Sequence, residues 1–168
     1  MGSRLCIALL FLGLLHTAAS ASRAAAMPFV DGRWSGDIKT QPDSSMLGEC
    51  WASTTFVDGT ILTLAEQRDE NWSLRLSNPA WHLELSGDYS MMAQVDFYPK
   101  LQVDGQAKSK SLLQIAIGGQ KTLLGYIENG HTIKLNSERF NENYDLEGSA
   151  KIIERIRNCV TEQLAGEK

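Results

Sequence analysis

The amino-acid sequence predicts a mainly β fold, an antiparallel sandwich or flattened barrel of about eight to eleven strands with one C-terminal α-helix. Three observations support this prediction: turn dipeptides are frequent, apolar residues alternate between them, and the apolar spacing becomes helical near the C-terminus. The dipeptides suited to tight turns are Asp31-Gly32, Asp58-Gly59, Gly87-Asp88, Asp104-Gly105, Gly118-Gly119 and Asn129-Gly130. They divide the chain into segments of strand length.

The N-terminal segment has the three parts of a secretory signal peptide. Arg4 supplies a positive charge, residues 7–15 form an apolar run, and small residues follow. The run is too short to cross a bilayer as a helix, which takes about 20 residues. We therefore expect a periplasmic or secreted protein that is not stably inserted in the membrane.

Cleavage is expected after Ala21, or as late as Ala26, because both positions end a small-x-small pattern. The prediction is a signal peptide over 1–21 and one β-rich domain over 22–168. The whole chain has a net charge of -4, which becomes -5 when Arg4 is removed. This acidic balance excludes a general nucleic-acid-binding protein, which needs a basic surface.

Apolar and polar residues alternate in two neighbouring segments that each begin with a tryptophan. Trp72, Leu74 and Leu76 share one face of an extended chain, and Trp81, Leu83 and Leu85 repeat this pattern after Asn78-Pro79. We expect a hairpin or two neighbouring strands with the apolar side chains inward. The alternative is a surface on which the two Trp side chains meet a ligand. The outward residues of the pair are Arg75, His82 and Glu84.

The remaining tryptophans and apolar segments extend the same pattern. Trp34 is expected to be buried, like Trp72 and Trp81, whereas the alternation does not assign a face to Trp51. Further strands are expected where apolar residues continue, in residues 89–97, 115–117, 123–127 and 133–135. The Asn129-Gly130 dipeptide predicts a hairpin between the last two of these.

The chain changes to helical spacing after residue 149. Apolar residues then form one stripe of a helix, which predicts an α-helix over 149–165. Ser149 is the expected N-cap and Gly166 the expected stop. The stripe residues are Ile152, Ile153, Ile156, Val160 and Leu164.

Two of the three cysteines, Cys50 and Cys159, remain after the signal peptide. An even pair in an oxidising compartment predicts a disulfide. Cys159 lies beside the apolar stripe, so the bond would fasten the C-terminal helix to the β-body. The alternative, a cysteine nucleophile acting with His82 or His131, needs a reduced thiol, which export disfavours.

Several landmarks of this chain resemble small exported β-rich proteobacterial proteins, which are sometimes attached to peptidase-like domains. The landmarks are Trp34-Ser-Gly36, Cys50 followed by Phe56 and Asp58-Gly59, Trp72-x-Leu-x-Leu76, Trp81-x-Leu-x-x-x-Gly87, Tyr144-x-Leu-x-Gly-Ser149 and Ile156-x-x-Cys159-Val160. The end of the chain is also similar to the invasion-associated locus B proteins. The resemblance implies a fold and a compartment, and it carries over no catalytic residue because each landmark is a packing, turn or cysteine residue.

The sequence contains no pattern that assigns a catalytic, cofactor or metal site. The motifs GxSxG, HExxH and CxxC are missing, and Gln120 stands where a phosphate-binding loop has glycine before Lys121. A copper site that combines His82 with Met91 or Met92 is disfavoured, because adjacent strand residues point to opposite faces. We therefore expect no cofactor and no metal.

Two classes of function remain. The first is a non-enzymatic binding module that acts through its sheet face, loops or edges on an envelope or extracellular protein, because a rigid scaffold presents loops well. The second is a hydrolase or inhibitor of envelope polymers, which requires at least two carboxylates in one groove. The carboxylates considered are Asp69, Glu70, Glu138, Glu142, Asp145 and Glu147.

Overall fold

The structure, a computed structural model, describes residues 28–40, 47–118, 121–138 and 141–167. The predicted signal peptide therefore lies outside the described residues.

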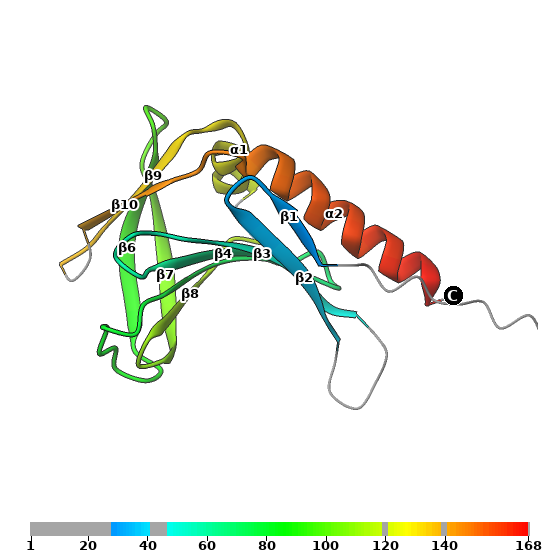
Figure 1. The fold of residues 1–168 in the computed structure, drawn as a ribbon. Coiled ribbons are helices and arrows are strands. Elements are labelled where there is room, and N and C mark those ends of the chain that lie inside the picture. Colours follow the sequence, from blue (N-terminus) through cyan, green and yellow to red (C-terminus); the bar gives the residue numbers. More distant parts are fainter. Residues whose placement is uncertain (1–27, 41–46, 119–120, 139–140, 168) are drawn as a thin grey trace, which may run out of the picture.

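Ten strands form one antiparallel sheet in the order β1-β2-β3-β4-β5-β8-β7-β6-β9-β10 (Figure 1). The strands are β1 (Phe29–Asp31), β2 (Trp34–Thr40), β3 (Leu47–Thr55), β4 (Ile61–Gln67), β5 (Trp72–Ser77), β6 (Asp88–Val95), β7 (Leu101–Ser109), β8 (Leu112–Ala116), β9 (Thr132–Asn136) and β10 (Asn141–Asp145). Two helices accompany the sheet, α1 (Lys121–Asn129) and α2 (Ser149–Gly166). The predicted mainly β class is confirmed, and the sheet is not closed into a barrel.

The core lies on one face of the curled sheet, where the helices pack. Successive strand residues point to opposite faces, so alternating apolar residues line this side. In β5 the inward residues Trp72, Leu74 and Leu76 are at most 5% exposed, and in β8 Leu113 and Ile115 are fully buried. Helix α2 adds the buried residues Ile152, Ile153, Ile156 and Val160. The predicted inward face of β5 is therefore confirmed.

The curl of the sheet brings its far strands together without pairing its edges (Figure 1). Arg33, in the turn between β1 and β2, contacts Asp145 at the end of β10 with 2.8 Å between Nη1 and Oδ2. Beside this ion pair the rings of Phe56 and Tyr144 lie 5.2 Å apart between centroids. These contacts join parts of the sheet that lie many strands apart.

Helix α2 begins at Ser149 as predicted, although its N-cap residue differs. Ser149 is buried, and its hydroxyl donates to the carbonyl of Ile127 in α1 over 2.7 Å. The residue before the helix, Gly148, has a φ of 85°, which favours glycine. The predicted N-cap role of Ser149 is therefore wrong, because its hydroxyl joins the two helices instead. Glu167 follows the helix and accepts a hydrogen bond from the backbone of Leu47 in β3.

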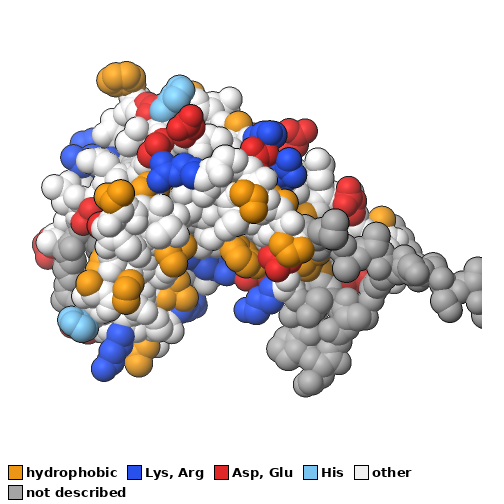
Figure 2. Space-filling model, viewed as in Figure 1, with side chains coloured by type: hydrophobic (Ala, Val, Ile, Leu, Met, Phe, Trp, Pro, Cys, Tyr) orange, Lys and Arg blue, Asp and Glu red, His pale blue; other side chains and the backbone are white. Residues whose placement is uncertain are grey.

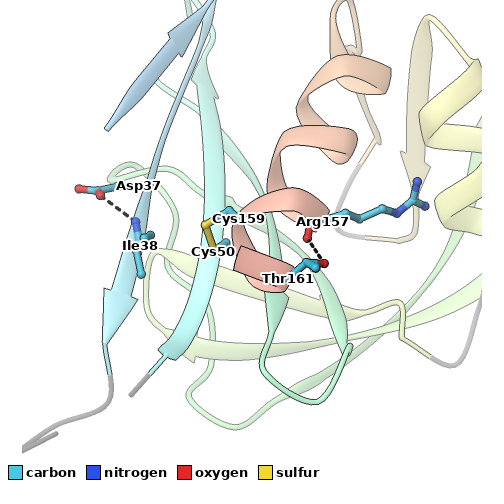
Figure 3. Close-up of a disulfide and its surroundings, with 6 residues drawn as sticks. All are labelled: Asp37, Ile38, Cys50, Arg157, Cys159 and Thr161. Atoms are coloured by element: carbon cyan, nitrogen blue, oxygen red, sulfur yellow. Dashed lines mark hydrogen bonds between the residues drawn. A yellow bond between two sulfur atoms is a disulfide. The ribbon is translucent and has the colours of Figure 1, made fainter. Parts of the chain in front are cut away.

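A disulfide fastens α2 to the sheet, as predicted. Cys50 on β3 and Cys159 on α2 are bonded, with Cα atoms 6.2 Å apart (Figure 3). Cys50 is on the core face of β3, opposite the apolar stripe of α2. The bond links positions 109 residues apart in the sequence.

Two predicted strands are not strands. Residues 123–127 belong to α1, where Leu123, Leu124 and Ile127 are buried on one side of a helix. Apolar residues at these positions fit a short helix as well as a short strand. The hairpin predicted at Asn129-Gly130 is therefore the end of a helix.

The second incorrect strand is the one predicted from Trp81. Residues 81–85 have no regular structure, because β5 pairs with β4 and β8 instead. The segment crosses the β7–β8 hairpin, where the backbone of Leu83 donates to the carbonyl of Lys110 over 2.8 Å. Trp81 packs against the core side as predicted, although it is only partly buried. Trp34 and Trp72 are buried as predicted.

Candidate functional site

A groove opens where the end of β4 and the start of β5 meet the two helices. It has a volume of about 330 Å³ and contains apolar residues from α1 and from the segment between β8 and α1. We call it the Glu66 groove, and its charged and aromatic residues are Glu66, Glu70, Trp72, Lys121, Glu128 and Arg157. Three carboxylates therefore share one concave site. This is the arrangement that a hydrolase or inhibitor of envelope polymers would require.

Glu66 is the buried charged residue of this groove. Every second residue of β4 faces the core, namely Leu62, Leu64 and Glu66. The strand therefore directs a carboxylate inward near its C-terminal end. Glu66 is only 6% exposed, and its Oε2 atom is buried with no hydrogen-bond partner. A buried polar atom without a partner costs about 1–3 kcal/mol of stability. Such an atom at the edge of a cavity marks a place where a ligand group would be favoured.

Burial raises the pKa of the Glu66 carboxyl above its ordinary range. The Trp72 indole, which hydrogen-bonds this carboxyl from the neighbouring strand, and the Arg157 charge both oppose that increase. The negative charge of Glu70 adds to it. Desolvation is the largest of these effects, so the site lacks a sufficient cationic partner for Glu66.

Arg157, the cation beside the Trp72 indole, is already paired. The Arg157 guanidinium lies 5.8 Å from the centre of the Trp72 ring. It also makes two hydrogen bonds to Glu128 on α1, of 2.9 and 3.2 Å. This two-point bond holds Arg157 on the wall of the groove and neutralises Glu128.

Glu70 and Lys121 have no ion-pair partner among the residues that the structure describes. Glu70 lies in the turn between β4 and β5 with a φ of 61°, and its backbone donates to the carbonyl of Gln67 over 3.0 Å. With Glu66, the groove thus holds two unpaired carboxylates against one unpaired ammonium group. One additional positive charge would bring the net charge of these three unpaired groups to zero.

A larger concave region, of about 450 Å³, lies at the start of β6. Its carboxylates are Glu84, Asp88 and Glu138, and all three residues are exposed. Water solvates such carboxylates at no cost, so this region provides no comparable drive to bind a cation. The Glu66 groove is therefore the candidate site.

The structure separates the residues considered for other chemistry. Cys50 and Cys159 are bonded to each other, so neither is a free thiol nucleophile. Met91 is in the core whereas His82 is exposed on the surface. Within the described ranges no group of three His, Cys, Asp or Glu side chains is placed to hold a metal ion. No helix in the described part of the chain has the length and apolar character to cross a membrane.

The sequence-based carboxylates fall in several places. Glu70 lines the groove, whereas Asp69 accepts a hydrogen bond from the Asn71 side chain and Asp145 pairs with Arg33. Sequence reasoning missed Glu66. The available signal was a charged residue at an inward position of an alternating strand, Leu62-x-Leu64-x-Glu66.

Replacing Glu66 with Gln should stabilise the protein at neutral pH by about 1 kcal/mol, because an amide is cheaper to bury than a carboxylate. A raised pKa in the folded state favours the protonated form. The wild-type protein should therefore lose stability as the pH rises through that pKa, and the advantage of the variant should vanish in acid. Urea unfolding of both proteins across this pH range measures the difference. Equal stability at every pH, or the same gain in the control Glu154→Gln on the exposed side of α2, would contradict the assignment.

Comparison with known proteins supports the fold. The crystal structure of invasion associated protein B from Bartonella henselae is similar to this chain, with a TM-score of 0.54 and 15% sequence identity. The match covers 80% of this chain and 98% of the other. No family model and no curated protein matches the sequence. The resemblance to the invasion-associated locus B proteins is therefore confirmed at the level of the fold.

Proposed function

We propose that this protein is an exported, non-enzymatic binding module whose Glu66 groove receives a lysine or arginine side chain of an envelope or extracellular protein. The observation that carries the proposal is the buried Oε2 atom of Glu66, which lacks a partner at an open cavity. The disulfide and the signal-like N-terminus support the exported location.

A cationic side chain matches the groove in charge and shape. Its ammonium or guanidinium group would give Glu66 the charged hydrogen-bond partner that it lacks, and Glu70 would add a second attraction. The apolar stem of the side chain would pack against Leu124 and Ile117, which line the same groove. An anionic ligand would instead meet two unpaired carboxylates.

One observation favours a second function, a hydrolase acting on envelope polymers. Glu66 and Glu70 share a groove, and burial raises the pKa of Glu66 as a general acid requires. The first proposal is preferred because the groove holds two unpaired carboxylates against one unpaired ammonium group, and this excess of negative charge attracts a cation.

Nuclear magnetic resonance titration tests the binding proposal. The probe is Nα-acetyl-lysine amide, and Nα-acetyl-norleucine amide is its uncharged counterpart. The indole N–H signal of Trp72, which reports on Glu66, should shift and saturate with the lysine probe alone. In Glu66→Gln the affinity should fall about tenfold, which corresponds to about 1.4 kcal/mol. The control Glu154→Gln should bind as the wild type does.

Two results would contradict the proposal. One is a saturable response that is equal for the lysine and norleucine probes, and the other is an unchanged affinity in Glu66→Gln. Turnover of a peptidoglycan or polysaccharide substrate that depends on both Glu66 and Glu70 would replace the binding function with the hydrolase.

A further inference from the structure

A second constellation lies on the opposite face of the sheet, away from both helices. Alternation along β3 turns Cys50 toward α2 and its neighbours Glu49 and Trp51 to the other side. Asp37 on β2 pairs in register with Trp51, and Figure 3 shows its side chain pointing away from α2. We call this region the Trp51 face, and its residues are Asp37, Lys39, Glu49, Trp51, Ala65, Ser73 and Arg75.

Trp51 differs from the other tryptophans because it does not belong to the core. Trp34 and Trp72 are core residues and Trp81 packs against the core, whereas Trp51 is half-buried on the outer side of the sheet. The next residues across the sheet are small, since Trp51 pairs with Ala65 and Ala65 pairs with Ser73. A large aromatic ring beside two small residues has room to lie along the sheet.

The burial of those small residues indicates what covers them. Ala65 is 0% and Ser73 is 3% exposed, although neither α1 nor α2 lies on this face. Among the described residues, long side chains of the same face are the available cover, and Trp51 is the direct neighbour of Ala65. Trp51 is itself only partly buried, so part of its indole reaches solvent on this face. In Figure 2 the molecule is hollowed on its lower side, beside the lower ends of β7 and β8.

A rigid ion pair lies beside the indole. Arg75 on β5 donates two hydrogen bonds to the two carboxylate oxygens of Glu49, one of them 2.9 Å long. Glu49 is 7% exposed, and the adjacent guanidinium holds its pKa below the ordinary range. The Nε atom of Arg75 and the hydroxyl of Ser73 are buried without a hydrogen-bond partner. Two polar groups on this face are therefore left to be satisfied.

The charges of the face balance. Asp37 and Glu49 are offset by Lys39, which pairs in register with Glu49, and by Arg75. A charged ligand would find no net attraction here, and a single partly exposed tryptophan is too small an apolar area for a lipid surface. A neutral ligand with one apolar face and many hydroxyl groups fits this combination.

We propose that the Trp51 face binds a neutral carbohydrate, with the C–H face of one pyranose ring stacked on Trp51 and its hydroxyl groups bonded to Arg75, Glu49 and Ser73. Aromatic rings favour such stacking because their flat faces are apolar and electron-rich. The fixed planar groups of the ion pair supply donors and acceptors at set directions. This site is separate from the Glu66 groove, which opens on the helix side of the sheet.

An array of neutral oligosaccharides tests the proposal, followed by fluorescence titration with the sugar that binds. The wild type should bind at least one of them with a change in tryptophan fluorescence. Trp51→Ala should weaken binding about tenfold or more, and Trp51→Phe should retain part of it because a flat ring remains. Since Trp51 is outside the core, circular dichroism should show both variants folded.

Two matched controls locate the site. Trp81→Phe alters a half-buried tryptophan elsewhere, and Glu66→Gln alters the groove on the other face, so both should bind the sugar as the wild type does. The proposal is wrong if no neutral oligosaccharide binds, if only anionic glycans bind, or if Trp51→Ala binds normally. Loss of sugar binding in Glu66→Gln would assign the sugar to the groove and also overturn the proposal.

Discussion

Replacing Trp34 with Ala should lower the free energy of unfolding by about 3–5 kcal/mol, the usual cost of removing a buried large aromatic side chain. Trp34 is 1% exposed, and its indole donates a 2.7 Å hydrogen bond to the carbonyl of Glu147. The residue therefore joins β2 to the segment that leads into α2. Its loss would leave both a cavity and an unpaired carbonyl.

Urea unfolding measures this effect, with Trp81→Ala as the matched comparison. Trp81 is only half-buried, so its replacement should cost clearly less than that of Trp34. Equal losses in the two variants would show that Trp34 does not have the structural role described here.

Removal of the disulfide should have the second large effect. The double variant Cys50→Ala/Cys159→Ala should lose roughly 2–4 kcal/mol, mainly because the unfolded chain gains freedom when a long loop is opened. Cys50 is 1% exposed, so a small packing loss adds to this value. Thermal unfolding of oxidised, reduced and double-variant protein measures the change. An unchanged melting temperature would contradict a structural role for the bond.

The disulfide also connects the two proposed sites. Cys50 lies between Glu49 and Trp51 on β3, and Cys159 lies on the same helix as Arg157 (Figure 3). Opening the bond should therefore loosen both the Trp51 face and the wall of the Glu66 groove. Any binding that is lost should return at lower temperature, where the folded state is restored. A folded Cys159→Ala variant with normal melting temperature and no binding would indicate a functional thiol.

The strands and the C-terminal helix could be predicted because their signals are local and repeated. Alternation is strict in β5, and the stripe of α2 extends over several turns. The disulfide followed from composition and compartment, together with the position of Cys159 beside that stripe. These features depend little on distant parts of the chain.

The errors arose where tertiary contacts decide the local structure. The apolar residues of α1 are too few to distinguish a helix from a strand, and contact with α2 stabilises the helix. The Trp81 segment has the pattern of a strand but no free neighbour, because β4 and β8 already flank β5. Local patterns do not contain this information.

The sites were harder to predict for the same reason. Glu66 becomes unusual only when α1 and α2 bury it, and Trp51 only when the sheet leaves its outer face uncovered. Of the groove's three carboxylates, the sequence analysis singled out Glu70 alone, among many surface carboxylates. Burial and missing partners, which distinguish these side chains, are properties of the folded molecule.

The pKa of Glu66, measured by carbon NMR of its carboxyl group with and without Nα-acetyl-lysine amide, tests whether this buried carboxyl receives a cationic side chain. In the free protein that pKa should lie above the ordinary range, because burial is not offset by a sufficient cationic partner. A bound ammonium group favours the ionised carboxylate, so saturation with the probe should lower the pKa. An ordinary pKa in the free protein, or a raised pKa that the probe leaves unchanged, would contradict the account.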